Sequence, residues 1–315
     1  MQSPKITIVE VGPRDGLQME SPVPTHIKVS LINQIARSGI RKIEATSFVH
    51  PKVIPQMRDA SEVMSLINRV PGTCYVGLVP NLRGTQDAIK SRVDAVKVVI
   101  CVTESSNQKN IKMSKAESIR QSEDIFKLAD QSGVSAEAVA SVAFGCPYEG
   151  NVTDAAVINL VESFVTIGYR EISIADTIGV ANPASVRHIS SILRKQFPQA
   201  HFSLHFHNTR GLGLANVLAG MDVGIDQFDT SIGGLGGCPI VKGGTGNVAT
   251  EDLVNMLDEM EVPCGVSLDS ILEAARMAQN ALDHPLSSYV LTSGSPASLY
   301  RSNLISGAEN LPEQT

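Results

Sequence analysis

Two histidines, His205 and His207, stand one residue apart in the segment HFHNTRG, directly after the apolar run AHFSL. In a strand, residues two apart point to the same side, so both imidazoles can face one site while Phe206 faces away. Imidazole nitrogens at this spacing can bind a divalent metal ion. The alternative is a pair of surface or hydrogen-bonded histidines, since histidine is found both buried and exposed.

A carboxylate and an amide elsewhere in the chain could complete such a metal site. Asp15 lies in the segment GPRDGLQ, and Asn247 ends a glycine-rich segment. A mixed set of nitrogen and oxygen ligands suits Mg²⁺ or Mn²⁺, whereas structural zinc sites are usually rich in thiolates. Alternatively, each residue could only stabilise a turn, because Asp and Asn are favoured in turns.

Polar residues near Asp15 are candidates for contact with a substrate. Arg14 is a permanent cation whose forked donors fit a carboxylate, a thioester oxygen or an enolate, and a salt bridge to Glu44 is a compatible role. Glu44 could also orient a ligand or the arginine. We expect Gln18, in the same segment as Arg14, to bind substrate.

Two residues later in the sequence could either bind substrate or have a structural role. Asp176 ends the run EISIAD, where it could contact a substrate or cap the turn TIGVANP. Arg210 adds a cation beside the histidine pair and could bind a second carboxylate, with an exposed salt bridge as the alternative.

Residues 233–247 contain seven glycines, with Cys238 near the middle of the segment. Such a loop can approach a ligand closely, adopt positive φ and close over a site. A thiol on it is a plausible proton donor, and the alternative is a small buried cysteine in an irregular loop. Cys146, in the segment GCPYEG, invites the same hypothesis with less support.

These residues must be positioned by the elements between them. Eight runs of β-type composition alternate with segments of helical periodicity, which favours a closed (β/α)₈ TIM barrel over an open doubly wound sheet. The first turn, VGPRDGLQ, has no G-x-G-x-x-G dinucleotide motif. The predicted strands start at Ile6, Lys42, Cys74, Ala95, Ala138, Glu171, His201 and Gln227.

Active sites of such barrels lie at the C-terminal ends of the strands, where five of the eight predicted strands deliver polar candidates. A helical hairpin over residues 250–282 should close the structure. We therefore predict one catalytic domain over residues 1–282, including additional C-terminal helices, and an extension of it over residues 283–315, partly flexible.

Composition limits the possible partners and location. The 315 residues are 43% hydrophobic and 18% charged, as in globular proteins, and the net charge of −6 argues against nucleic acid as the main partner. Five cysteines without a CxxC pair indicate a reducing compartment. We find no signal segment and no long uncharged apolar stretch, so we expect a cytoplasmic protein that does not enter a membrane.

Taken together, the motifs resemble those of the 3-hydroxy-3-methylglutaryl-CoA (HMG-CoA) lyase family, which belongs to the metal-dependent TIM-barrel lyases. The resemblance runs from about Ile6 to Leu282. The glycine-rich GGLGGCP segment after H-x-H is its most specific element. The matching segments are VEVGPRDGLQ, IEATSFVHPKVIPQM, PNLRG, GCPYEG, EISIADTIGVANP, HFHNTRG, GGLGGCP and TGNVATEDLV.

The resemblance implies a role for each matched residue. It makes Arg14, Asp15 and Glu44 the shared catalytic set, in which Arg14 stabilises a developing enolate, and it makes Cys238 the catalytic cysteine. It implies divalent-metal-dependent retro-Claisen cleavage of HMG-CoA to acetyl-CoA and acetoacetate, and a possible homodimer. The implied ligands of Mg²⁺ or Mn²⁺ are Asp15, His205, His207 and Asn247.

The implied substrate is a coenzyme A thioester, but the chain has no P-loop for its phosphates. Lys109 and Lys112, in a basic segment after the fourth predicted strand, could contact these phosphates, although a solvated helix face is the alternative.

The chain departs from the usual lyase pattern just after the histidines. Where many such lyases read HCHDTYGQALAN, this chain reads HFHNTRGLGLAN, with Asn208, Arg210 and Leu212 as the differences. After Gln18, Met19, Glu20 and Ser21 replace the usual Asn-Glu-Lys. These changes bear on the substrate, so a lyase for another 3-hydroxy-3-carboxyacyl-CoA, such as citramalyl-CoA, is one alternative. The others are a Claisen-condensing acyltransferase and a noncatalytic barrel.

Overall fold

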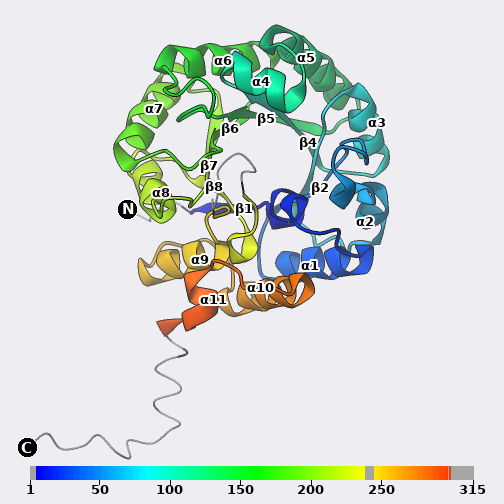
Figure 1. The fold of residues 1–315 in the computed structure, drawn as a ribbon, viewed down its shortest axis with the longest axis vertical. Coiled ribbons are helices and arrows are strands. Elements are labelled where there is room, and N and C mark those ends of the chain that lie inside the picture. The colour runs from blue at the N-terminus through cyan, green and yellow to red at the C-terminus, as the bar shows by residue number, and fades with distance from the viewer. Residues whose placement is uncertain (1–4, 238–244, 297, 299–315) are drawn as a thin grey trace, which may run out of the picture.

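Eight parallel strands form a closed barrel in chain order from β1 to β8 (Figure 1). The computed structural model describes residues 5–237, 245–296 and 298. Pairing of Thr7 with Gln227 joins the first strand to the last and closes the sheet, which confirms the barrel prediction. The strands are β1 Thr7–Glu10, β2 Lys42–Ser47, β3 Cys74–Leu78, β4 Ala95–Cys101, β5 Ser135–Ser141, β6 Glu171–Asp176, β7 His201–Phe206 and β8 Gln227–Thr230.

Helices surround the barrel as an outer ring (Figure 1). Local sequence sets several of their starts: Ser114 and Glu117 form a reciprocal capping box at α5, and Asn182 caps α7 before a proline in its first turn. The ring helices are α1 Thr25–Arg37, α2 Ala60–Leu66, α3 Leu82–Lys90, α4 Glu104–Ile111, α5 Lys115–Gln131, α6 Asp154–Ile167, α7 Pro183–Gln196 and α8 Gly213–Asp222.

The predicted C-terminal hairpin is confirmed as α9 Thr250–Glu259 and α10 Leu268–Leu282, followed by α11 Tyr289–Ser293. Asp252 in α9 accepts hydrogen bonds from Ser288 Oγ at 2.8 Å and from Val290 N at 2.8 Å. These bonds tie the segment after α10 to α9. The domain boundary at residue 282 stays a prediction.

The main apolar core lies between the strands and the helix ring. Phe228 and Leu204 point outward from β8 and β7 and are fully buried. Gly220 in α8 packs directly on them, since a Cβ there would lie 2.7 Å from Leu204 and 3.0 Å from Phe228. The glycine allows helix and sheet to approach closely.

The inside of the barrel contains charged side chains as well as apolar ones. TIM barrels usually fill this space with layers of branched apolar side chains. Here Lys97 of β4 lies in register with Glu137 of β5, Glu137 with Glu171 of β6, and Glu171 with His201 of β7. Paired residues of a parallel sheet share a face, so these charged or ionisable side chains of four neighbouring strands all lie on the inner face of the barrel.

The predicted start of the fifth strand at Ala138 is wrong. Strand β5 begins at Ser135, and Glu137 lies within it, buried. Glu137 is charged, and a buried strand is expected to be apolar, so the sequence did not indicate that the strand includes it. It fits because Lys42 Nζ lies 2.7 Å from the carboxylate inside the barrel.

Within the described ranges, no helix is both long and apolar enough to cross a membrane.

Candidate metal and active site

The C-terminal ends of the strands bring Asp15, His205 and His207 into one cluster. Asp15 lies in the helical turn η1 Gly12–Gly16 after β1, His205 lies near the end of β7, and His207 follows it. One potential ligand atom from each of the three lies within 4.8 Å of the others. The structure therefore brings together three of the four predicted metal ligands in the geometry of a possible metal site.

Asn247 joins this cluster through Asp15. Its Nδ2 donates to Asp15 Oδ2 at 2.9 Å and to Leu235 O at 3.0 Å. Its Oδ1 is buried, as is His207 Nδ1, and neither atom has a hydrogen-bond partner among the described residues. Buried polar atoms are rarely left unpaired, so two orphaned acceptors beside a carboxylate fit a bound cation.

Burial and neighbouring charges prepare these groups for a cation. Burial alone would raise the pKa of Asp15, but Arg14 and the two histidines lower it to about 2, so the carboxylate is ionised. Burial lowers the pKa of His207 to about 4 and keeps its imidazole neutral, the form that binds metals. His205 Nδ1 lies 3.4 Å from Asp229 Oδ2, which leaves Nε2 for a ligand.

Arg14 forms the predicted salt bridge with Glu44. Its Nε donates to Glu44 Oε1 at 2.5 Å and its Nη1 to Asp15 Oδ1 at 2.8 Å. No described residue accepts a hydrogen bond from Nη2. Gln18 Nε2 donates to Asp15 Oδ1 at 3.2 Å and so lies beside the same carboxylate.

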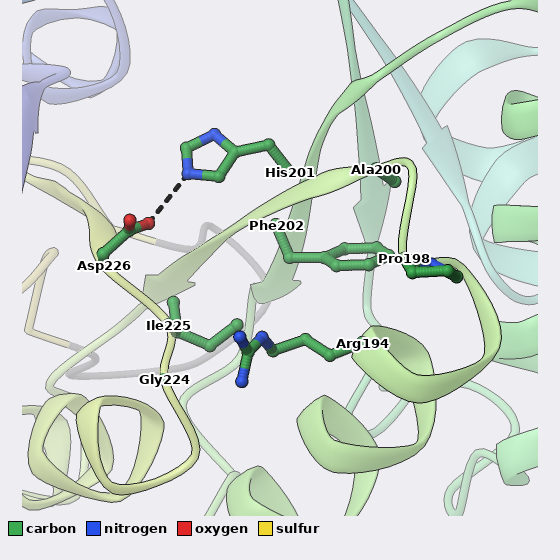
Figure 2. A pocket seen from close by; sticks show the side chains of 8 residues that line it. All are labelled: Arg194, Pro198, Ala200, His201, Phe202, Gly224, Ile225 and Asp226. Carbon is green, nitrogen blue, oxygen red and sulfur yellow. Dashed lines mark hydrogen bonds and ion pairs between the residues drawn. The ribbon is translucent and has the colours of Figure 1, made fainter.

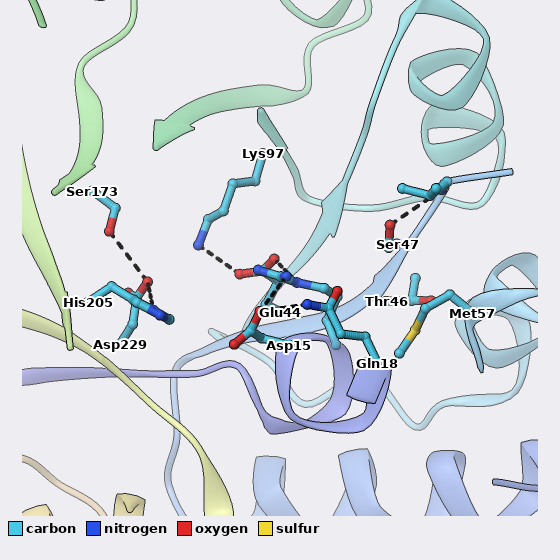
Figure 3. Close-up of polar contacts among 12 residues, drawn as sticks. Asp15, Gln18, Glu44, Thr46, Ser47, Met57, Lys97, Ser173, His205 and Asp229 are labelled. Carbon is cyan, nitrogen blue, oxygen red and sulfur yellow. Dashed lines mark hydrogen bonds and ion pairs between the residues drawn. The ribbon is translucent and has the colours of Figure 1, made fainter. Parts of the chain in front are cut away.

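Two charged residues of the site were missed from the sequence, Lys97 and Asp229 (Figure 3). Lys97 Nζ donates to Glu44 Oε2 at 3.0 Å, and Ser173 Oγ donates to Asp229 Oδ2 at 3.4 Å. Burial alone would raise the pKa of Glu44, but Arg14 and Lys97 hold it below its usual value. Lys97 is the single charge in the strand AVKVVIC, a signal that could have marked it.

Comparison with known proteins identifies the family to which this site belongs. The sequence pattern of the HMGL-like family matches residues 5–278. The chain belongs to the HMGL-like family. This membership confirms the resemblance that the sequence motifs carry.

Several HMG-CoA lyases are close relatives of the chain. The Bacillus subtilis enzyme is 44% identical over 285 residues, which are 90% of this chain and 95% of that protein. The human mitochondrial enzyme is 41% identical over 287 residues, 91% of this chain and 88% of that protein. A solved HMG-CoA lyase from Acinetobacter baumannii, in complex with coenzyme A and 3-methylmalate, has a TM-score of 0.89 at 41% identity and covers 93% of this chain and 96% of its own.

In this HMGL-like chain, buried acids anchor the start of the glycine-rich segment. Glu10 accepts hydrogen bonds from Gly12 N at 2.7 Å and from Ile232 N at 3.0 Å. Glu251 accepts one from Gly233 N at 2.8 Å. Cys238, the predicted catalytic cysteine, lies outside the described residues.

For Asp176 the capping alternative is confirmed. Its two carboxylate oxygens accept hydrogen bonds from Val180 N at 2.9 Å and from Ala181 N at 2.8 Å. Asp176 lies in register with Phe206, on the face of the sheet opposite His205. The geometry therefore does not support its predicted role in substrate binding.

Arg210 forms no salt bridge with a described residue, which was the alternative to its predicted role in substrate binding, and that role stays a prediction. Its Nη1 donates to the carbonyl oxygens of Ile178 and Gly179, each at 2.8 Å, so Arg210 stabilises the turn after β6.

The two lysines predicted to contact coenzyme A lie near the end of α4. Lys109 Nζ lies 4.7 Å from the ring centroid of Tyr148, and Lys112 follows the last residue of α4 with a φ of 63°. Both lie after β4, as expected, on or at the end of a helix.

Proposed function

We propose that the chain is an HMG-CoA lyase, which cleaves its substrate to acetyl-CoA and acetoacetate. The observation that carries this function is the cluster of Asp15, His205 and His207 beside Arg14 at the C-terminal end of the barrel. The identity of 40–44% to HMG-CoA lyases over about nine-tenths of the chain supports the same reaction.

The cation of this proposal is Mg²⁺ or Mn²⁺, held by Asp15, His205, His207 and the Oδ1 of Asn247. The orphaned Asn247 Oδ1 and His207 Nδ1 support this ligand set. The substrate would bind such a cation through its oxygen atoms, and the cation would lower the pKa of the tertiary hydroxyl group.

Side chains of the protein would transfer the protons and stabilise the negative charge that forms during cleavage. The hydroxyl group passes its proton to the ionised carboxylate of Asp15. The bond from the carbinol carbon to the thioester α-carbon then breaks, its electron pair passes into a thioester enolate, and the carbinol carbon becomes the ketone carbon of acetoacetate. Arg14 binds the enolate oxygen, with Nη2 as the nitrogen that no described residue occupies. Glu44 orients Arg14 through Nε.

Cys238 then donates a proton to the enolate carbon and so forms acetyl-CoA. This assignment rests on the match of GGLGGCP to the lyase motif. Gln18, next to Asp15, is proposed to contact the acyl group, and Lys109 and Lys112 the phosphates of coenzyme A. The homodimer and the cytoplasmic location stay predictions.

A substrate panel tests the function. The purified Mg²⁺-loaded protein is incubated with HMG-CoA, citramalyl-CoA and analogues with larger substituents, and acetyl-CoA release is measured. We expect the highest kcat/KM for HMG-CoA. Rapid turnover of another thioester with none of HMG-CoA would overturn the proposed substrate, and release of free CoA from acetyl-CoA plus a 2-oxo acid would indicate a condensing enzyme instead.

A further inference from the structure

A column of ion pairs runs from the active-site arginine through the inside of the barrel. Below Glu44, Lys97 Nζ lies 3.7 Å from Glu137 Oε2, and Lys42 Nζ lies 2.7 Å from Glu137 Oε1. Lys42 in turn lies 3.6 Å from Glu171 Oε2. We call Lys97, Glu137, Lys42 and Glu171 the interior column.

The column ends at the opposite mouth of the barrel. His201 Nδ1 lies 3.0 Å from Glu171 Oε2, and its Nε2 lies 2.7 Å from Asp226 Oδ1 (Figure 2). The side chains of His201 and Asp226 are 41% and 47% exposed, whereas those of Lys97 and Glu44 are 3% and 1% exposed. The part of the column next to the active site is thus the part that water does not reach.

Lys97 determines how Glu44 can bind Arg14. An arginine and a carboxylate tend to form two parallel hydrogen bonds, and the side of the guanidinium that carries Nε also carries Nη2. Here Glu44 Oε1 accepts from Arg14 Nε, and Glu44 Oε2 accepts from Lys97 Nζ (Figure 3). Without Lys97, Oε2 would be free to take Nη2.

We propose that Lys97 is a positioning residue: by holding Glu44 Oε2, it keeps the Arg14–Glu44 pair to a single hydrogen bond and leaves Arg14 Nη2 for the substrate. This inference rests on the proposed function, in which Arg14 binds the enolate oxygen. The residue acts through Glu44 and touches neither the substrate nor the cation.

The test compares three variants of the full-length enzyme. Lys97→Met keeps the length of the side chain but removes its charge, and we expect kcat to fall about tenfold to a hundredfold while KM for HMG-CoA changes little. Lys97→Arg, which can still donate to Glu44, should recover part of kcat. Lys42→Met removes a cation from the same column without touching Glu44 and should keep kcat near the wild-type value.

A fourth variant separates positioning from stability. Breaking a buried ion pair from one side is strongly destabilising, whereas removing both partners is much less so. Lys97→Met combined with Glu137→Gln removes one charge of each sign and leaves Lys42 beside Glu171. This double variant should therefore regain thermal stability but not kcat. A crystal structure of Lys97→Met should show Glu44 bound to both Nε and Nη2 of Arg14.

Equal kcat losses in Lys97→Met and Lys42→Met, recovery of kcat in the double variant, or an unchanged Arg14–Glu44 pair in the crystal would overturn the inference. A wild-type enzyme that does not cleave HMG-CoA would instead overturn the proposed function. Wild-type kcat in Lys97→Met, with an active wild type, would overturn the inference alone.

Discussion

Arg14 contacts two carboxylates with different nitrogen atoms, and these contacts fix the orientation of its guanidinium group at the C-terminal end of the barrel. Nε is committed to Glu44 and Nη1 to Asp15, so both contacts fix the guanidinium plane. Asp15 is shared in turn, because Asn247 Nδ2 donates to its other oxygen. A side chain held in this way loses little further freedom when a substrate binds, which favours catalysis.

Cys238→Ala provides the most direct test of a single catalytic residue. If the thiol protonates the enolate carbon, kcat should fall about a hundredfold or more, the range typical of a lost general acid. Mn²⁺ affinity, measured by calorimetry, should stay unchanged because no predicted ligand is altered. Cys264→Ala, a cysteine that packs in the hydrophobic core, is the control. Wild-type turnover by Cys238→Ala would remove the cysteine from the mechanism.

Sequence reasoning located the histidine pair, Asp15 and Arg14, because each lies in a short segment at the end of a predicted strand. It missed Lys97 and Asp229. Their roles depend on which residues of neighbouring strands share a register, and the sequence of one strand does not state this. For Asp176 the residue was found but its partners were not, since a capping carboxylate and a substrate-binding one look alike in sequence.

Among the elements, the strands were easier to predict than the turns between them. Apolar runs such as CYVGLV and HFSLHF match β3 and β7 because buried parallel strands have this composition. Segments around η1 and η4 Ile232–Gly234 were expected to be a turn and a loop, but their helical conformation was not predicted. Buried Glu10 and Glu251 bind the backbone N–H groups of these turns, a long-range effect without a local signal.

The contact between α9 and η4 should make stability depend on pH. Burial raises the pKa of Glu251 from 4.5 to about 8. The folded state therefore binds this proton more tightly than the unfolded state. The resulting stabilisation is fully present below pH 4.5 and is lost as pH rises toward 8. Between these limits, one such group lowers the free energy of unfolding by up to ~1.4 kcal/mol per pH unit.

Urea unfolding of wild type and Glu251→Gln across this pH range measures the effect. The variant should lose most of the decrease, keeping a smaller one from Glu10, whose pKa burial raises to about 7. Glu259→Gln, at the exposed end of the same helix, should behave as wild type. Parallel pH curves for Glu251→Gln and wild type would contradict the assignment.

On the scale of the whole molecule, the proposed metal site joins distant parts of the chain. Asp15 and Asn247 are 232 residues apart in sequence, and the histidines come from a third segment. The barrel assembles this ligand set, because β8 must pair with β1 before the segments that follow them can meet. The unfolded chain has no such site, so a cation that binds the folded state alone stabilises the entire fold.

Metal removal should therefore lower the thermal stability of the molecule. A cation at a hundred times its Kd stabilises the folded state by about 2.7 kcal/mol, which corresponds to a Tm increase of roughly 5 °C for a chain of this size. Treatment with EDTA should abolish this increase, and added Mn²⁺ or Mg²⁺ should restore it. Asp15→Asn should lose most of the response, because it removes the charged ligand. Asp226→Asn, at the opposite mouth of the barrel, should keep it. A full Tm response in Asp15→Asn would show that the stabilising cation binds elsewhere.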